Sequence, residues 1–215
     1  MKKPFVIAID GPAASGKGSL AKKLAEYLNF DFLDTGALYR RVALYVLKQG
    51  IALDNTEKII KAAQEFQKNL SEPYDDATLR RDNVGNAASH IAQIPEIRQI
   101  LFDFQQNFAQ NAKKGAVLDG RDIGTVICPD ADLKLFITAS TEKRAQRRHK
   151  ELHSRGLDVK YEAVLAEMQE RDNRDNVRLK DHMRPDIDNH LIDTSDMGPD
   201  EVFQKALDIY NSSSR

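Results

Sequence analysis

The chain has 215 residues, of which 41% are hydrophobic and 30% are charged, and its 32 basic residues nearly balance its 33 acidic ones. A length of this order suits one sizeable domain, and the balanced charge argues against a general binder of nucleic acids or membrane surfaces. The single cysteine excludes an internal disulfide, and the apolar run after MKKP is too short for an export leader or a membrane span, so we expect a cytoplasmic protein.

Apolar runs and helical patterns alternate along the chain. The runs that predict strands are 5–9, 30–33, 116–118, 133–138 and 190–192. The patterns that predict helices are 20–28, 38–47, 57–70, 87–112, 141–154, 160–176 and 199–210. The polar, aperiodic stretch 71–86 predicts a surface loop or flap. Continuous apolar strands that alternate with helices are typical of parallel sheets, so we predict an α/β fold with a five-stranded parallel sheet covered by helices in three layers.

The first strand leads into a phosphate-binding pattern, GxxxxGK, from Gly11 to Lys17. Glycines let the backbone wrap closely, so that successive N–H groups and the start of a helix meet an anion, and Lys17 adds a full charge at the β- and γ-phosphates. The alternative, a glycine-rich turn that only joins strand to helix, is disfavoured by this context. The predicted ATP-binding residues of the loop are Gly11, Pro12, Ala13, Ala14, Ser15, Gly16, Lys17, Gly18 and Ser19.

The position after the lysine departs from the usual pattern, in which Ser or Thr holds Mg²⁺. Here that position is Gly18, and the hydroxyl follows at Ser19. The GKGS form is similar to nucleoside-monophosphate kinases rather than to GTPases or motor ATPases. We therefore expect Mg²⁺ to arrive with ATP and to be held through water and the nucleotide, with Ser19 and Asp119 as candidates and no direct protein ligand.

Two predicted strands end in polar clusters, and ligands of open α/β sheets bind at such ends. Thr35 and Arg40 follow the second strand. Thr35 offers a hydroxyl, and Arg40 offers a guanidinium that can bind a phosphate through two N–H groups. The alternative is a capped helix start with a surface arginine. Asp119 ends the third predicted strand, in the place of a Walker-B acid near the metal. Arg121 and Asp122 follow it between glycines, and the alternative for them is a salt-bridged turn.

The helical segments carry further candidates. Ser89 and Arg98 are donors, although a serine in a helix is usually only solvated. The segment ERDNRDNVR, residues 170–178, places charged residues on one helix face, where guanidiniums repel one another unless an anion or carboxylates neutralise them. The alternative is a solvated, salt-bridged face. The residues of this face are Arg171, Arg174, Asp175 and Arg178.

The basic segment 141–156 suits a lid whose arginines, such as Arg144 and Arg148, close over the donor nucleotide and exclude water. Nucleic-acid binding is the other interpretation. It is disfavoured because aromatic residues are not interleaved with the basic ones.

These clusters, in this order, resemble the bacterial cytidylate kinase family. The similar stretches run from one end of the chain to the other: IAIDGPAASGKGSLAKKLA, LDTGALYR, VGNAASHIAQIPEIR, DGRDIGTVICPDADLKLFITAS, RAQRR, ERDNRDNVR and LIDTS. The resemblance implies transfer of the γ-phosphoryl group of ATP to CMP or dCMP. The predicted catalytic residues are Lys17, Asp119, Arg121 and Arg178.

The resemblance also implies how CMP is held. Arg40, Arg121 and Arg178 would hold its phosphate, and Thr35 would lie in the same site. Ser89, Arg98 and Asp122 would contact the cytosine, and Arg171 and Asp175 the sugar. The chemistry of the base agrees, because O2 and N3 of cytosine accept hydrogen bonds and its N4 amine donates one to a carboxylate. Uracil would turn an oxygen toward Asp122, which costs about 1–3 kcal/mol if buried.

We therefore expect one P-loop kinase domain over residues 1–215, with an acceptor-binding flap at about 62–98 and a lid at about 147–165. Its expected ligands are ATP with Mg²⁺ and CMP or dCMP, and we expect a monomer that binds neither nucleic acid nor membrane. The nearer alternative is a P-loop kinase for another small acceptor, such as UMP, dTMP or a non-nucleotide. The more distant one is a nucleotide-dependent switch or binding module without an acceptor.

Overall fold

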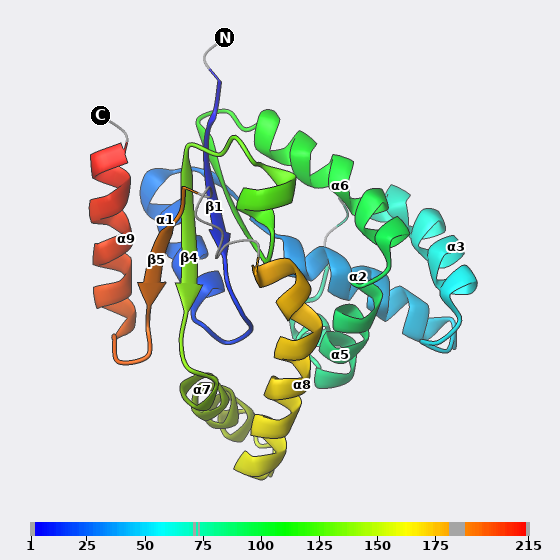
Figure 1. Ribbon diagram of the computed structural model, residues 1–215. Helices are drawn as coiled ribbons and strands as arrows, with labels where there is room; N and C mark the ends of the chain where they lie inside the picture. Colours follow the sequence, from blue (N-terminus) through cyan, green and yellow to red (C-terminus); the bar gives the residue numbers. More distant parts are fainter. Residues whose placement is uncertain (1–2, 71, 73, 181–187, 214–215) are drawn as a thin grey trace. The chain divides into compact units, whose positions relative to one another are not determined.

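The computed structural model of the protein describes residues 3–70, 72, 74–180 and 188–213. The chain divides into two compact units, and Figure 1 colours the chain along the sequence. The first, here called the sheet unit, is Met1–Leu33 together with Ala109–Arg215; the second, the helical unit, is Asp34–Phe108.

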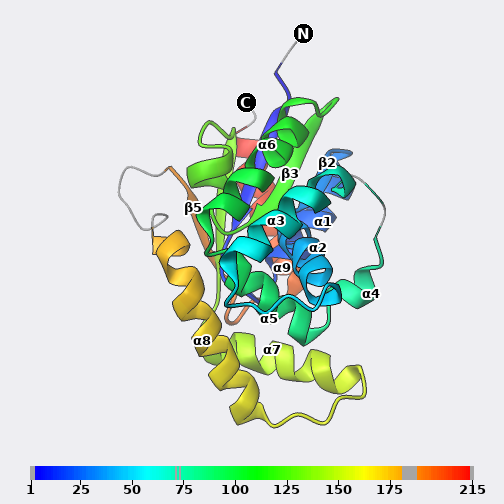
Figure 2. The same cartoon turned by 90° about the vertical axis from the view of Figure 1, so that its right-hand side faces the viewer.

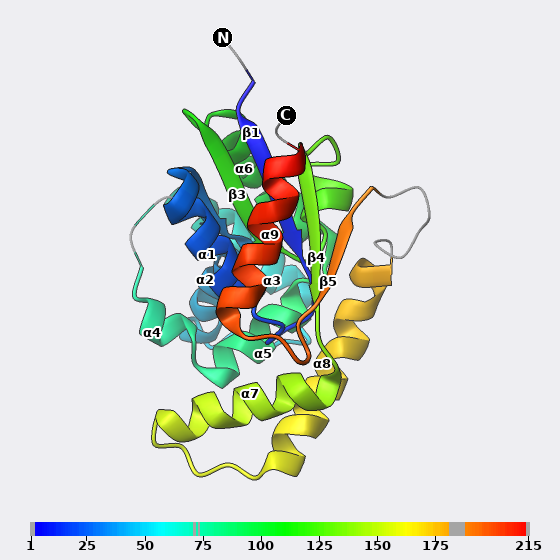
Figure 3. The same ribbon diagram turned by 90° about the vertical axis from the view of Figure 1, so that its left-hand side faces the viewer.

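The sheet has five strands in the order β2-β3-β1-β4-β5. Figure 3 labels β3, β1, β4 and β5, and Figure 2 labels β2. The strands are β1 (Phe5–Asp10), β2 (Asp31–Asp34), β3 (Gly115–Gly120), β4 (Leu133–Thr138) and β5 (His190–Asp193). The central strand β1 pairs in parallel with β3 and β4, so that Ile7 lies between Val117 and Leu133. All five predicted strands and the α/β fold are thus confirmed.

Helices cover one face of the sheet in the sheet unit. Helices α1 (Lys17–Leu28) and α9 (Pro199–Ser213) pack there, as Figure 3 shows. Alternate residues of a strand face opposite sides, and Ile7 and Ile9 of β1 join Leu24 of α1 in this core. Burial of such apolar side chains contributes about 25 cal/mol per Å² removed from water.

A short π-helical segment, η2 (Ile123–Ile127), lies against the other face of β1. It was not predicted, because its five residues are too few to show a helical period. A Cβ atom at Gly124 would lie 3.5 Å from that of Ala8, so the segment approaches the strand closely.

Helices α7 (Thr141–Ser154) and α8 (Tyr161–Leu179) follow β4 and pack against each other, and Figures 1 and 2 show that they cross. Ala145 and Leu152 of α7 pack against Val164 of α8 in a small apolar core. The ranges predicted for both helices, 141–154 and 160–176, are confirmed to within a few residues.

The helical unit contains no strand in its described residues beyond Asp34, the last residue of β2 (Figure 2). Its helices are α2 (Thr35–Lys48), α3 (Thr56–Phe66), the 3₁₀ turn η1 (Gln67–Asn69), α4 (Asp76–Leu79), α5 (Asp82–Ile91) and α6 (Pro95–Gln110), the last two residues of α6 being counted with the sheet unit.

Two boundaries in this unit differ from the prediction. The stretch 71–86 is not a loop throughout, because α4 and the first half of α5 lie within it. The buried side chains of α5 begin at Val84, and their helical spacing continues through Ala87 to Ile91, so the pattern crosses the predicted boundary. Nor is 87–112 one helix: α5 ends at Ile91 and α6 begins with Pro95, which suits a first turn but not a helix interior.

Arg41 organises the end of α3 and the turn η1. Its guanidinium is buried and donates to the backbone carbonyls of Asn69 and Leu70. It also lies 5.6 Å from the ring centre of Phe66 and 5.0 Å from that of Tyr74. Burial lowers the pKa of Arg41, and the carbonyl contacts place its charge at the negative end of the helix.

Candidate functional site

The phosphate-binding loop is pressed against the end of β4. A Cβ atom at Gly11 would lie 2.0 Å from the carbonyl oxygen of Ile137, and Gly11 has a φ of +150°, so only glycine fits there. Ala14 also has a positive φ, 59°, and Gly16 is the N-cap of α1. The loop therefore turns sharply into the helix whose amino end faces an anion in this kind of fold.

Lys17, the first residue of α1 after the loop, forms an ion pair with Asp119 at the end of β3. The Lys17 Nζ lies 3.1 Å from Asp119 Oδ1, with both side chains largely buried. The other oxygen, Oδ2, would lie 3.0 Å from a Cβ atom at position 18, a tight contact that gives a physical reason for Gly18 where Ser or Thr is usual. Ser19, one residue later, is exposed.

The same residues can be tested as a site for Mg²⁺, which prefers oxygen ligands and keeps several waters. The donors here are the carboxylate of Asp119 and the exposed hydroxyl of Ser19. Among the described residues, no group of three or more His, Cys, Asp or Glu side chains is arranged to hold a metal ion. This donor set fits an ion held mainly by water and phosphate.

Two arginines of α7 hold the loop from outside. Arg144 donates to the carbonyl of Ala13 at 3.2 Å, and Arg147 donates to that of Ser15 at 3.5 Å. Because a trans peptide points its C=O and N–H in opposite directions, these bonds turn the following N–H groups, of Ala14 and Gly16, away from the arginines. The side chains thus fix the orientation of the amides that would meet a phosphate.

Arg144 is itself held by α8. Its two terminal nitrogens lie 2.9 and 2.6 Å from the carboxylate oxygens of Asp172, a bidentate pair, and its Nε donates to the carbonyl of Ala139. Arg148, the other lid arginine predicted from sequence, lies 2.8 Å from Glu151 on its own helix.

Sequence analysis missed Arg147 and Thr194. Arg147 donates to the hydroxyl and the carbonyl of Thr194, and that hydroxyl lies 3.0 Å from the carbonyls of both Ser15 and Thr138. The signals available were weak: Arg147 stands three residues after Arg144 on the same helix, and Thr194 directly follows β5. The contact between Thr194 and Ser15 spans 179 residues, which no local pattern reveals.

Arg121, after β3, pairs with α8. Its partner belongs to the charged helix face predicted from the sequence, here called the stripe (Arg171, Arg174, Asp175 and Arg178). The Arg121 Nε donates to Asp175 Oδ2 at 2.8 Å, and a terminal nitrogen donates to the carbonyl of Gly120. Burial opposes its charge, but Asp175, helped by Asp119 and Asp10, outweighs that effect and raises the pKa of Arg121. The turn and the stripe are therefore one cluster, joined by two residues 54 positions apart in sequence.

The stripe is not a self-contained network of salt bridges. Asp172 and Asp175, the aspartates of this part of α8, pair with arginines of other elements, Arg144 and Arg121. Within the helix Arg174 lies 3.9 Å from Glu170, and Arg171 is half-buried. Arg178 belongs to the last turn of α8, and its side chain is outside the part that the structure describes.

A carboxylate that sequence analysis did not single out supports the Arg121 turn. Both oxygens of Asp10, the last residue of β1, accept hydrogen bonds of 2.8 Å, from the backbone N–H groups of Ile123 and Gly124. Burial raises the pKa of Asp10 to about 7; the two N–H bonds lower it, and the nearby Asp122 and Asp119 add to the rise.

In the helical unit, the residues predicted to bind the acceptor lie on three helices. Asp34 accepts from the N–H of Ala37 at 3.0 Å and so caps α2, as the capped-helix interpretation expected. Arg40 lies 3.8 Å from Asp34, with a quarter of its side chain exposed. Thr35 is buried in the first turn of α2, and Ser89 is buried in α5. Arg98, in α6, is half-buried.

The family model described as cytidylate kinase matches residues 7–212. The chain belongs to the cytidylate kinase family. It is 48% identical over 209 residues to a cytidylate kinase of Paramagnetospirillum magneticum, covering 96% of this chain and 98% of that protein. It is 47% identical over 208 residues to a cytidylate kinase of Rhodospirillum rubrum, covering 95% and 96%. The predicted family is thus confirmed.

Solved structures agree on the fold of this cytidylate kinase family member. A gluconokinase from Sinorhizobium meliloti is similar with a TM-score of 0.52 and 16% identity, covering 97% of this chain and 92% of that one. A shikimate kinase from Bacteroides thetaiotaomicron has a TM-score of 0.52 and 10% identity, covering 96% and 98%. In the described residues, the helices include none with the length and apolar character needed to span a membrane.

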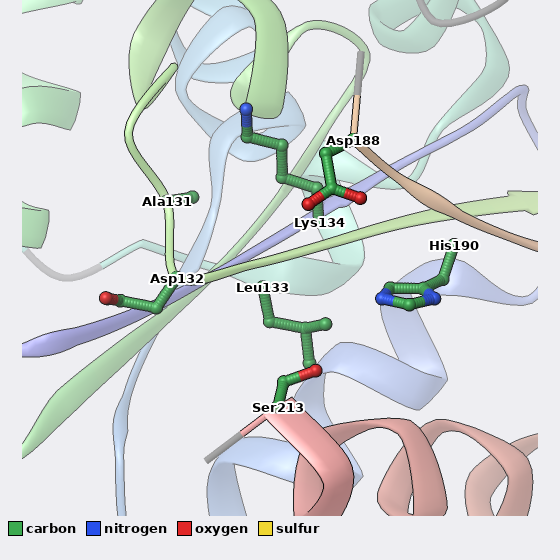
Figure 4. Close-up of a pocket in the computed structure, with 7 residues that line it drawn as sticks. All are labelled: Ala131, Asp132, Leu133, Lys134, Asp188, His190 and Ser213. Atoms are coloured by element: carbon green, nitrogen blue, oxygen red, sulfur yellow. The ribbon is translucent and has the colours of Figure 1, made fainter. Parts of the chain in front are cut away.

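A cavity of about 200 Å³ lies elsewhere, at the amino ends of β4 and β5 (Figure 4). Its lining residues are Ala131, Asp132, Leu133, Lys134, Asp188, His190 and Ser213. Asp132 already has a structural partner there, since it accepts from the N–H of Val6. The cavity contains none of the loop residues and is smaller than typical ligand pockets, so we do not assign it to either nucleotide.

Proposed function

We propose that the protein transfers the γ-phosphoryl group of ATP to CMP or dCMP, giving ADP and CDP or dCDP. The observation that carries this proposal is the cytidylate kinase match over residues 7–212. The geometry of the loop supports the donor half of the reaction, because a P-loop lysine and turned backbone amides are suited to a triphosphate. The roles of individual residues in binding ATP and CMP are part of the proposal.

On the donor side, the loop residues 11–19 surround the phosphates of ATP, and Lys17 neutralises charge at the β- and γ-phosphates. Arg144 holds the loop in position, and Arg148 closes from the lid. Mg²⁺, bound with ATP, would be held near Asp119 and Ser19 through water, and when bound it neutralises charge on the phosphates.

On the acceptor side, the family resemblance assigns the CMP phosphate to three arginines, the base to three polar side chains and the sugar to the α8 stripe. The assigned residues are Arg40, Arg121 and Arg178 for the phosphate, Ser89, Arg98 and Asp122 for cytosine, and Arg171 and Asp175 for the sugar, with Thr35 in the same site. The pairing of Arg121 with Asp175 supports a shared role for turn and stripe.

Transfer of this kind needs alignment and charge neutralisation more than covalent help. No general base is required, because the acceptor phosphate is already nucleophilic. Water must be excluded, or ATP would be hydrolysed instead. We assign that role to closure of a flap at about 62–98 and a lid at about 147–165. A monomeric state and a cytoplasmic location, expected from the sequence, remain predictions.

A coupled assay for ADP, run with ATP and each of CMP, dCMP, UMP, dTMP and AMP, tests the proposal. We expect rapid ADP formation with CMP or dCMP and slow formation with the others. Preference for UMP or dTMP would favour the nearer alternative. ATP binding without ADP formation from any acceptor would favour a binding module and overturn the proposal.

A further inference from the structure

The turn after β3 is anchored by a carboxylate from another strand. Asp10 ends β1 and directly precedes Gly11, the first residue of the phosphate-binding loop. Its two oxygens accept, at 2.8 Å each, from the N–H groups of Ile123 and Gly124, which are 113 and 114 residues away. Asp10 is 1% exposed, so both bonds are shielded from water.

These two N–H groups open the π-helical segment η2, and they would ordinarily be satisfied by a local cap. The residue at the N-cap position is Asp122, but its side chain makes no capping bond. Asp10 performs that task from the neighbouring strand. The backbone of Asp122, with a φ of −148° and a ψ of 31°, is thereby fixed without using its own carboxylate as the cap.

The same carboxylate therefore connects two parts of the proposed reaction. On one side it is covalently continuous with the loop at Gly11; on the other it fixes the turn that carries Arg121 and Asp122. We propose that Asp10 is a positioning residue that sets the orientation of the Asp122 carboxylate and, through it, the preference for cytosine over uracil. This inference rests on the proposed function.

Substituting Asp10 by Asn tests the inference with little change of shape. An amide has one oxygen, so it can accept from one of the two N–H groups while its own NH₂ faces the other. The turn loses one of its two anchors. We expect the CMP/UMP ratio of kcat/KM to fall about tenfold and the KM for ATP to stay within about twofold. Asp10→Ala, which removes both anchors, lowers the ratio further.

A matched control is available at the other end of the strands, before the first residue of β4. Asp132 Oδ2 also accepts a 2.8 Å bond from a distant strand N–H, that of Val6, beside the cavity of Figure 4. Asp132→Ala, compared with Asp10→Ala, removes the same kind of bond away from the loop and the turn. A purely structural contribution lowers the folded fraction but leaves the CMP/UMP ratio unchanged, and this is the result expected for Asp132→Ala.

The outcomes separate the inference from the function on which it rests. If the unsubstituted protein does not phosphorylate CMP, the proposed function fails first. If CMP is the preferred acceptor and Asp122→Asn lowers the CMP/UMP ratio, but Asp10→Asn leaves it unchanged, the inference alone is overturned. If Asp122→Asn also leaves the ratio unchanged, Asp122 does not read the base and the inference fails with it.

If Asp10→Asn does not fold, amide hydrogen exchange of the unsubstituted protein gives the answer. We expect slow exchange at Ile123 and Gly124 that becomes slower when CMP is added, because base contacts at Asp122 hold the turn that these amides begin. Exchange at these two amides as fast as in exposed loops, or unaffected by CMP, overturns the inference.

Discussion

Arg121 and Arg144 of the sheet unit are held more tightly than Arg40 of the helical unit. In the sheet unit, Arg121 and Arg144 meet the carboxylates of Asp175 and Asp172 at 2.8 and 2.6 Å. In the helical unit, Arg40 lies 3.8 Å from Asp34 with a quarter of its side chain exposed. Close pairs fix a guanidinium before any ligand arrives, whereas a long, solvated contact leaves it able to turn toward an anion. The sheet unit is thus preorganised, and Arg40 is left adaptable.

The largest effect is expected at Lys17, which lies in the preorganised part. Lys17→Ala removes the charge proposed for the β- and γ-phosphates, and turnover should fall on the order of 10³-fold. Lys23→Ala is a matched control, because Lys23 belongs to the same helix and forms an exposed pair with Asp200. Steady-state rates for the two variants test the role, and near-normal turnover in Lys17→Ala would contradict it.

The next effect concerns stability at Arg121. Arg121→Ala leaves Asp175, which is 2% exposed, as a buried carboxylate without this partner, and this should cost about 3–5 kcal/mol of unfolding free energy. Chemical denaturation measures the loss. Adding Asp175→Asn should recover part of it, because the buried charge is then removed; a loss below about 1 kcal/mol would show that the pair is not preorganised.

Asp10 predicts a pH dependence of stability. The pKa of Asp10 in the folded protein is about 7, above the ordinary value of 3.8. Between pH 3.8 and about 7 the folded state therefore binds more protons than the unfolded state. Stability relative to Asp10→Asn should therefore fall as pH rises from about 4 to about 7, by as much as roughly 4 kcal/mol, and level off above that. Denaturation midpoints of both proteins across this range provide the check. A parallel pH profile for the two would contradict the buried-carboxyl account.

The smallest effect on stability is expected at Arg40. Because its contact with Asp34 is long and solvated, Arg40→Ala should change the unfolding free energy by less than about 1 kcal/mol. Its proposed role in holding the CMP phosphate nevertheless predicts a rise of about tenfold in the KM for CMP with little change for ATP. Lys48→Ala, on an exposed position of the same helix, is the control. Equal KM values in both variants would remove Arg40 from the acceptor site.

The sequence allowed the sheet and the loop to be predicted, because both have local signatures. Continuous apolar runs such as 133–138 mark buried parallel strands, and the spacing from Gly11 to Lys17 marks the loop. The helix boundaries in the helical unit were harder. The break before Pro95 and the start of α5 depend on which apolar residues become buried together, which is a tertiary property.

The partners of the charged residues could not be predicted from local spacing. Asp172 and Asp175 lie on the same helix as Arg171 and Arg174, so a solvated, salt-bridged helix face was the alternative to a ligand site. The structure instead pairs both carboxylates with arginines of other elements. The anchoring of η2 by Asp10 has the same character, because the topology, rather than the spacing, brings the end of β1 beside this segment.

A crystal structure with CMP bound is the most direct test of the central claim that this protein binds a pyrimidine monophosphate as phosphoryl acceptor. The account predicts that the guanidiniums of Arg40, Arg121 and Arg178 contact the CMP phosphate and that Asp122 accepts from the N4 amine. It would be contradicted by a structure in which these arginines point away from the phosphate and another side chain meets N4.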